Sequence, residues 1–390
     1  MHTILSSYDA CLLLLYTVEN DARTLNIART LVKHGRSVCI IALGSEATRR
    51  RFAREGIEIV PLTGVTEGRF FWRWWDFARQ LVPLLPRLKA RQYWACEGYV
   101  LTFALLFSWL HSAQLVYDSR EIYSALGTVV GRPFVQSVIS AIERFCVRFV
   151  DTLITSGDLD SAYLHERFRR ERRRQYEQNV LPVTIMNLPP YKPPIEPRPN
   201  RIRERFGLSA ETRIVLYQGM IFPGRGLLPV VRALPFVSNA AFVLFGEGSF
   251  SATVRRTAEE CSVSDRVLLA GKVPYDELPV WTASADMGVA FIEPISLSYE
   301  FALPNKLFEY CMAGIPTLVS DIPALRDVLE RHPIGIVANA HATDEQLAAC
   351  ISACLDHEAQ VEFRRKCLAA AKEYSWEAQE QRIVEICLSA

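Results

Sequence analysis

The sequence predicts an α/β protein made of two Rossmann-like domains that face each other across a cleft, and three observations carry this prediction. Apolar runs alternate with helix-like stretches along both halves of the chain. These runs are continuous, which is typical of parallel strands covered by helices on both faces. At 390 residues the chain is longer than one ordinary core supports. The proline-rich stretch 187–199 separates the two alternations and predicts a stiff linker.

The composition excludes several function classes. Lys+Arg 44 against Asp+Glu 43 leaves a formal charge of +1, so no overall attraction to a polyanion such as nucleic acid is expected. Ten cysteines without a CxxC pair favour neither a zinc site nor a disulfide framework, and they fit a reducing cytoplasm. No stretch reaches the roughly 18 apolar residues of a membrane span, and the N-terminus lacks a signal-peptide pattern. The nearest apolar stretch, 99–110, is predicted to be a buried helix.

The first half begins as a regular alternation. Strands are expected at 11–16, 37–43 and 57–62, with helices at 21–34 and 46–55. Asn20 or Asp21 can cap the first helix. A later strand at 114–117 runs into polar residues, among them Arg120 and Glu121. Since α/β sheets bind ligands at the carboxyl ends of their strands, these side chains are candidates for a site.

The rest of the first half contains a helix at 134–149, a strand at 151–155 and two unusual segments. In segment 69–94 aromatic residues alternate with arginines, as in segments that sit at lipid headgroups. The alternative is aromatic packing between the sheet and a helical lid. The basic run 167–174 predicts contact with anionic lipid, or else a solvated helix face or loop.

Beyond the linker the alternation starts again. Strands are expected at 213–217, 241–245, 267–269, 287–291 and 317–319, with helices after 226, from 251 and near 275–283. A second Rossmann-like layer is the simplest account of this pattern.

One stretch of the second half, 303–316, organises the functional prediction. Pro304 suits the start of a helix, and Gly314 with Pro316 ends it. The helix N-terminus and the Lys306 ammonium can hold a phosphate, and Glu309 one turn later can accept hydrogen bonds from a sugar diol. The arrangement suits a nucleotide sugar. An amphipathic surface helix with a solvated lysine and glutamate is the alternative.

With these stretches in view, the chain resembles the GT-B glycosyltransferases of the retaining family-4 type (glycosyl transferases group 1). The likeness is strongest over 217–321. It rests on the segments Tyr217-Gln218-Gly219, Gly224-Arg225-Gly226, Phe245-Gly246-Glu247-Gly248, Gly271-Lys272-Val273 with Leu278-Pro279, and the helix from Pro304 to Gly314. In this order they look like the family's phosphate loop, second glycine turn, nucleobase loop and donor helix. Glu309 matches the ribose-binding glutamate.

The first half resembles the family more diffusely. The similar segments are Asn20-Asp21-Ala22-Arg23, Tyr117-Asp118-Ser119 with Glu121, Glu143, Asp151 and Asn187-Leu188-Pro189, and Trp376 resembles a tail that crosses back to the first domain. The resemblance therefore implies an acceptor domain at 1–190, a donor domain at 191–373 and a returning helix at 374–390.

The sequence departs from the family at three positions. Arg120 stands where relatives often have histidine, and Met220 replaces an arginine of the phosphate loop. Phe301 stands where the first glutamate of a pair is expected, and Glu300 beside it can substitute.

The resemblance implies transfer of a sugar from a UDP- or GDP-sugar to a glycan or lipid-linked acceptor, with retention, in the synthesis of a cell-surface polysaccharide or glycolipid. Arg225, Lys306 and Glu309 are the catalytic candidates, since charge on the leaving diphosphate must be stabilised. The donor-binding candidates are Gly219, Gly224, Gly246, Lys272, Pro304, Asn305 and Glu300. On the acceptor side, Glu97, Arg120 and Glu121 are candidates, with helix capping as the structural alternative.

No metal-binding aspartate pair stands out, so no divalent ion or cofactor is expected beyond the nucleotide-sugar co-substrate. The predicted location is the cytoplasm, with peripheral membrane contact through 69–94 and 167–174. The rival functions are a nucleotide-sugar epimerase or hydrolase, which would consume donor without acceptor, and a catalytically degenerate binding subunit.

Overall fold

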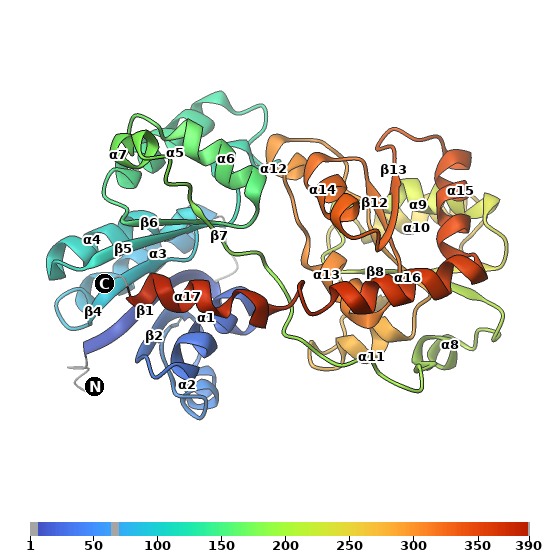
Figure 1. Cartoon of the computed structure of the whole chain (residues 1–390), viewed down its shortest axis with the longest axis horizontal. Coiled ribbons are helices and arrows are strands. Elements are labelled where there is room, and N and C mark those ends of the chain that lie inside the picture. The colour runs from blue at the N-terminus through green and yellow to red at the C-terminus, as the bar shows by residue number, and fades with distance from the viewer. Residues whose placement is uncertain (1–6, 64–69, 389–390) are drawn as a thin grey trace. The chain divides into compact units, whose positions relative to one another are not determined.

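The computed structural model describes residues 7–63 and 70–388 (Figure 1). The chain divides into two compact units, unit 1 (Met1–Met186 with Gln379–Ala390) and unit 2 (Asn187–Ala378). In the described part of the chain, no helix is both long and apolar enough to cross a bilayer.

Unit 1 is built on a parallel sheet whose described strands lie in the order β3-β2-β1-β4-β5-β6-β7. Its strands are β1 (Ser7–Thr17), β2 (Val38–Leu43), β3 (Ile57–Leu62), β4 (Lys89–Ala95), β5 (Gln114–Ser119), β6 (Thr152–Thr155) and β7 (Val183–Thr184). Its helices are α1 (Ala22–Lys33), α2 (Glu46–Ala53), α3 (Phe70–Leu81), α4 (Leu101–His111), α5 (Pro133–Val147), α6 (Asp158–Arg167), α7 (Arg173–Glu177) and α17 (Glu380–Leu388).

In the core of unit 1, alternate residues of β1, such as Leu13 and Leu15, are buried together with apolar residues of α3, α4, α5 and α6. The last helix, α17, lies beside α1 although the two are far apart in the sequence (Figure 1). Lys33 of α1 forms an ion pair with Glu380 at 2.7 Å, and Gln92 Nε2 of β4 donates to the carbonyl of Ile386 at 2.8 Å. Unit 1 therefore contains both early and late segments of the chain.

Unit 2 repeats the architecture with the strand order β10-β9-β8-β11-β12-β13, all pairings of its described strands being parallel. Its strands are β8 (Arg213–Gln218), β9 (Ala240–Phe245), β10 (Val267–Gly271), β11 (Met287–Ala290), β12 (Thr317–Ser320) and β13 (Gly335–Ala338). Its helices are α8 (Arg201–Phe206), α9 (Leu227–Ala233), α10 (Ser251–Glu260), α11 (Leu278–Ala283), α12 (Leu297–Glu300), α13 (Asn305–Ala313), α14 (Pro323–Arg331), α15 (Asp344–Leu355) and α16 (His357–Ala370).

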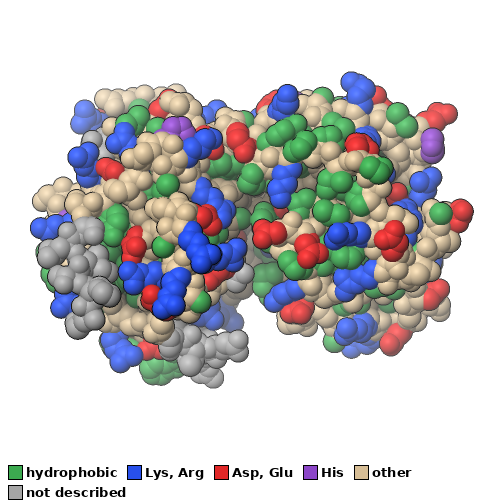
Figure 2. Space-filling view, turned by 90° about the horizontal axis from the view of Figure 1, so that it is seen from below, with side chains coloured by type: hydrophobic (Ala, Val, Ile, Leu, Met, Phe, Trp, Pro, Cys, Tyr) green, Lys and Arg blue, Asp and Glu red, His purple; other side chains and the backbone are tan. Residues whose placement is uncertain are grey.

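The predicted α/β class with two Rossmann-like layers is confirmed, whereas the cleft between them stays a prediction. Charged side chains of both signs are interspersed on the face of each unit seen in Figure 2, as the small net charge leads one to expect. Of the two predicted caps of α1, Asp21 accepts from Thr24 N at 2.8 Å, and the Asn20 side chain lies outside the described residues.

Segment 69–94 divides into two elements with different surroundings. It contains α3 and β4, and the prediction missed β4 because aromatic and basic residues mask its apolar side. Tyr93 and Trp94 in β4 and Phe77 in α3 are fully buried, which supports the alternative of aromatic packing for these rings. Trp72 and Trp75 of α3 are exposed. Arg69 and the side chains of Phe70 and Phe71 lie outside the described residues.

The prediction of a buried helix at 99–110 was only half right. The side of α4 that faces the sheet is buried, at Phe103 and Phe107 for example. Leu106, Trp109 and Leu110 are about half exposed, at 46%, 50% and 56%. A uniformly apolar sequence has no periodicity to show which side meets the core, so the sequence alone gave no sign of this exposed side.

In the basic run 167–174, several arginines are bound within the protein. The Arg167 guanidinium lies 3.4 Å from Glu143, and Arg169 pairs with Glu166 at 2.8 Å. Arg172 donates to the carbonyl of Val150 at 2.5 Å. Arg170, Arg173 and Arg174 are exposed, which agrees with the predicted alternative of a solvated helix face or loop.

Candidate functional site

The predicted donor helix is present as α13. Pro304 occupies the N-cap with extended backbone, and Gly314 ends the helix in the left-handed conformation at φ 71°. Leu307, Phe308, Cys311 and Met312 are buried, as the predicted stripe requires. The first turn of α13, which carries Asn305 and Lys306, therefore presents a helix N-terminus with a lysine beside it.

Tyr310, which the sequence did not single out, fixes α13 to the sheet. Its hydroxyl accepts from Gln218 N at 3.1 Å and donates to the carbonyl of Leu216 at 3.2 Å. A Cβ on Gly288 of β11 would lie 2.2 Å from the tyrosine ring, so a glycine there makes room for it. The helix is thus held against β8 at its carboxyl end.

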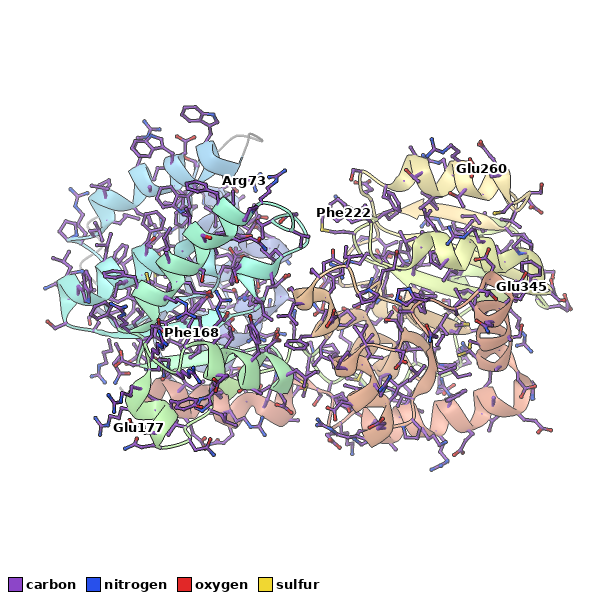
Figure 3. All side chains as sticks on the ribbon, turned by 90° about the horizontal axis from the view of Figure 1, so that it is seen from above. Arg73, Phe168, Glu177, Phe222, Glu260 and Glu345 are labelled. Carbon is purple, nitrogen blue, oxygen red and sulfur yellow. The ribbon has the colours of Figure 1, made fainter. Side chains whose placement is uncertain are left out.

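Two glycine turns lie at this same edge of the unit 2 sheet. Gly219 follows β8 and its N–H donates to the carbonyl of Phe245 at 2.9 Å. Gly246 follows β9, and a Cβ on it would lie 1.9 Å from the carbonyl oxygen of Gly219. Ile221 N donates to the carbonyl of Glu247 at 3.0 Å. The loops after β8 and β9 therefore touch backbone to backbone, and Phe222, labelled in Figure 3, marks the first of them.

Glu293, another residue that the sequence reasoning missed, closes the loop after β8 from the side. It accepts from Gly226 N at 3.2 Å through Oε1, and its own N–H donates to the carbonyl of Gly224 at 3.1 Å. The available signal was its position just beyond β11, at a strand end of the kind that pointed to Arg120.

Two cations meet beside this loop. The Lys306 Nζ lies 3.7 Å from the centroid of the Tyr217 ring, and the Arg225 guanidinium lies 5.0 Å from that of Tyr299 in α12. Burial lowers the pKa of Lys306 well below its ordinary value, and the charge of Arg225 lowers it further. Aromatic faces hold both side chains, and the charge of Glu309 opposes the fall in the pKa of Lys306.

Glu309 is oriented by a short chain of hydrogen bonds. Gln218 Nε2 donates to Glu309 Oε2, and Thr282 Oγ1 donates to Gln218 Oε1 at 2.8 Å. Burial raises the pKa of Glu309, while the bond from Gln218 and the charge of Lys306 oppose that rise. A carboxylate held in this way can accept further hydrogen bonds from a diol.

The other donor-side candidates lie at the periphery of this group. Lys272, in the loop after β10, forms an exposed ion pair with Glu247 at 3.2 Å. Glu300 is the last residue of α12 and is half-buried, as is Phe301 after it. Met220, at the position of the family arginine, is exposed. Among these candidates, the structure brings Gly219, Gly246, Arg225, Lys306 and Glu309 together most closely.

In unit 1, the Arg120 guanidinium is hydrogen-bonded to side chains of the protein itself. It donates to Asp118 Oδ2 at 3.0 Å, to Asp21 Oδ2 at 2.5 Å and to Thr24 Oγ1 at 2.7 Å. These bonds tie the end of β5 to the first turn of α1, so Arg120 positions the strand ends. Glu121 next to it is exposed.

Glu97, directly after β4, is the unusual acid of unit 1. It is buried, and its Oε2 has no hydrogen-bond partner among the described residues. Burial raises the pKa of Glu97 to about 8, against the opposing charge of Arg120, and the carboxylates of Asp21, Asp118 and Glu121 raise it further. The carboxyl group therefore holds its proton at neutral pH and can donate it to an acceptor atom.

This protonation predicts a pH dependence of stability. Because the pKa of Glu97 is higher in the folded chain, its stabilising effect is complete below its unfolded pKa of 4.5 and is lost as the pH rises through about 8. Glu97→Gln is expected to remove this loss, so that the variant gains on the order of a few kcal/mol over wild type between pH 5 and pH 8.5. Urea unfolding at four pH values measures the difference. A difference independent of pH would contradict the assignment.

Comparison with known proteins agrees with this geometry. Two sequence families match the chain, the glycosyl transferases group 1 over residues 200–374 and the glycosyl transferase 4-like domain over residues 21–183. Over 165 residues the chain is 26% identical to the GDP-mannose-dependent alpha-(1-6)-phosphatidylinositol monomannoside mannosyltransferase of Mycobacterium tuberculosis, a match that covers 41% of this chain and 43% of that protein.

Two further relatives extend the match. The 2-deoxystreptamine glucosyltransferase of Streptomyces kanamyceticus is 24% identical over 255 residues, which are 63% of this chain and 62% of that protein. The matches thus span less than two thirds of these curated relatives. The crystal structure of Anabaena HepE with UDP and glucose superposes with a TM-score of 0.75 at 15% identity, covering 98% of this chain and 100% of that one. With family matches over both units and two parallel α/β sheets, the chain belongs to the group 1 glycosyltransferases of GT-B fold.

Proposed function

We propose that the chain transfers a hexosyl group from a UDP- or GDP-sugar to a hydroxyl group of a glycan or lipid-linked acceptor, in the synthesis of a cell-surface polysaccharide or glycolipid. The observation that carries the proposal is the group in unit 2 formed by Lys306, Arg225 and the N-terminus of α13, with Glu309 one turn further along. Cations suit a diphosphate, and a carboxylate one turn away suits a ribose.

The names of the relatives support this donor class. The mycobacterial relative is a GDP-mannose-dependent mannosyltransferase, and Anabaena HepE was also crystallised with UDP-glucose. These two nucleotides are therefore the first to test.

The chemistry follows from where charge develops. When the bond between the anomeric carbon and the phosphate oxygen breaks, the electron pair stays on the diphosphate. Lys306, Arg225 and the helix N-terminus would stabilise that charge without a protein nucleophile and without a divalent ion. Transfer with retention follows if the leaving phosphate accepts the proton of the incoming hydroxyl on the same face of the sugar.

The acceptor side is assigned to unit 1, at the carboxyl ends of β4 and β5. The protonated Glu97 is the side chain there with an unpaired oxygen, so it is proposed to bind an acceptor oxygen, with Glu121 nearby. Contact with a membrane, where a lipid-linked acceptor resides, is proposed to involve segment 69–94. The paired arginines of 167–174 make that run the weaker candidate.

Calorimetric titration tests the donor site. The purified protein is titrated with UDP, GDP, ADP and CMP, with and without magnesium, beside Glu309→Ala and the control Glu358→Ala on the surface of α16. We expect one nucleoside diphosphate to bind without magnesium and Glu309→Ala to weaken it about tenfold or more, about 1.4 kcal/mol. The control is expected to bind like wild type.

The other outcomes separate the rival functions. If none of the four nucleotides binds, the proposed donor site is wrong and the degenerate subunit is favoured. If donor is consumed at full rate without any acceptor, the activity is that of an epimerase or hydrolase.

A further inference from the structure

Three neighbouring helices of unit 1 turn large apolar side chains away from their own core. We call these side chains the apolar face. It consists of Trp72 and Trp75 on α3, Val82 in the turn after α3 (Val82–Leu84), Leu106, Trp109 and Leu110 on α4, and Phe134, Val138, Ile142, Phe145 and Phe149 on or just after α5. In Figure 3, rings project outward from α3, the helix that Arg73 marks.

Members of the apolar face on neighbouring helices lie close together. Between α4 and α5, the Trp109 ring lies 4.9 Å from that of Phe149 and 6.5 Å from that of Phe145, measured between centroids. Between α3 and α4 there is an open hollow of about 380 Å³, whose walls include Trp75, Val82 and Leu106. The hollow is therefore an opening within the apolar face itself.

The pattern of α5 shows that this exposure is systematic. Phe134, Val138, Ile142 and Phe145 recur at spacings of four, four and three, which is the stripe that a surface helix normally turns toward its core. Here the stripe is exposed, with Phe134 79% accessible. Contiguous exposed apolar surface over three helices marks an interaction site.

Charge around the apolar face selects the partner. On α3, α4 and α5 the described acidic side chains are Asp76, which lies 3.6 Å from Arg79, and Glu143, which is buried against Arg167. Exposed arginines stand around the face: Arg79 at the hollow, Arg87 after α3, and Arg132 and Arg148 at the two ends of α5. Aromatic and aliphatic residues with a basic rim are suited to a bilayer of anionic lipid.

A second copy of the chain fits this surface less well. Two such faces packed around a twofold axis would bring their basic rims together, and the described acidic side chains on the same helices, Asp76 beside Arg79 and the buried Glu143, are too few to compensate. An anionic bilayer meets both requirements, since headgroups neutralise the rim and acyl chains cover the rings.

We infer that the apolar face of α3, α4 and α5 docks on an anionic lipid bilayer and that the hollow between α3 and α4 takes up part of a hydrocarbon chain. The inference rests on the proposed membrane contact and makes it specific. It keeps α3, which lies within segment 69–94, and adds α4 and α5.

Vesicle flotation tests the inference without any transfer reaction. The full chain is floated with vesicles of phosphatidylcholine alone and of phosphatidylcholine with phosphatidylglycerol. We expect binding to the anionic vesicles, and at least a tenfold weaker binding for Val138→Gln with Ile142→Gln. The matched control, Val361→Gln with Phe236→Ser, changes exposed apolar residues of unit 2 and should bind like wild type.

Two further measurements keep the result unambiguous. Lipids brominated along their acyl chains should quench tryptophan fluorescence of the wild type, and Trp75→Phe should reduce this quenching while vesicle binding persists. Sedimentation velocity shows whether the face joins two copies instead. A dimer broken by the α5 variant, or a folded α5 variant that floats like wild type, would overturn the inference. Nucleotide titration of the same variants separates this outcome from a failure of the proposed function.

Discussion

Lys306→Ala is expected to reduce kcat/KM for the donor by about 10²- to 10³-fold, or about 3 to 4 kcal/mol of transition-state stabilisation. The loss is expected because of where the Lys306 ammonium lies. Nζ lies over the Tyr217 ring at the edge of the phosphate loop, and a Cβ on Gly219 would come within 3.4 Å of it. Neither Met220 nor the paired Lys272 can replace this charge. Steady-state rates with saturating acceptor measure the loss, with Lys366→Ala on α16 as the matched lysine control.

The same residue gives a second signature in binding. Burial and the charge of Arg225 lower the pKa of Lys306, and an anionic diphosphate beside it is expected to raise that pKa, so binding takes up protons in the pH range between the two pKa values. Titration over a series of pH values, each in two buffers of different ionisation enthalpy, measures the uptake and the pH range in which it occurs. Equal proton uptake by wild type and Lys306→Ala, together with an unchanged rate, would refute the role of Lys306.

Gly246→Ala is expected to destabilise unit 2 by about 4 kcal/mol or more, or to prevent its folding. Its backbone has φ 143°, and the new Cβ would lie 1.9 Å from the Gly219 carbonyl oxygen. The Cβ position is fixed by the backbone of residue 246 and the oxygen belongs to the main chain, so no side-chain rotation can relieve the clash. Donor binding should be lost with it, because the loop that carries Gly219 is displaced. Urea unfolding followed by circular dichroism measures the change.

Gly271→Ala is the matched control for that substitution. Gly271 also has a left-handed backbone, at φ 70°, but a Cβ there would have no atom within 4 Å. We expect a cost of about 1 kcal/mol, from backbone conformation alone. Similar losses for the two variants would show that loop contact at Gly246 is unimportant.

The sequence predicted those features that depend on local pattern. The limits of α13 follow from Pro304 and Gly314, and the strands that are continuous apolar runs appear close to their expected places. β4 was missed because Lys89, Arg91 and the aromatic rings interrupt its apolar run. Local pattern also gave no sign that one side of α4 is exposed, since all its sides are apolar.

The site was predictable only where a short motif carries it. Lys306 and Glu309 lie on one helix, so spacing places them together. Glu293 and Tyr299 contact the phosphate loop only because the fold brings distant parts of the chain together. Their spacing in the sequence does not predict either contact. Arg120 was named as an acceptor contact or a structural residue. Its three bonded partners, which include Asp21 and Thr24 nearly a hundred residues away, show the structural role.

The location of α17 has a consequence for how the protein is made. Residues up to Met186 are synthesised first, yet their unit also includes Gln379–Ala390. A ribosome therefore releases every residue of unit 2 before the helix that covers α1 is available. Until then the surface of α1 that α17 will cover, including Lys33, is open to other contacts. Unit 1, whose larger part is synthesised before unit 2, is thus completed only after the whole of unit 2 has been synthesised.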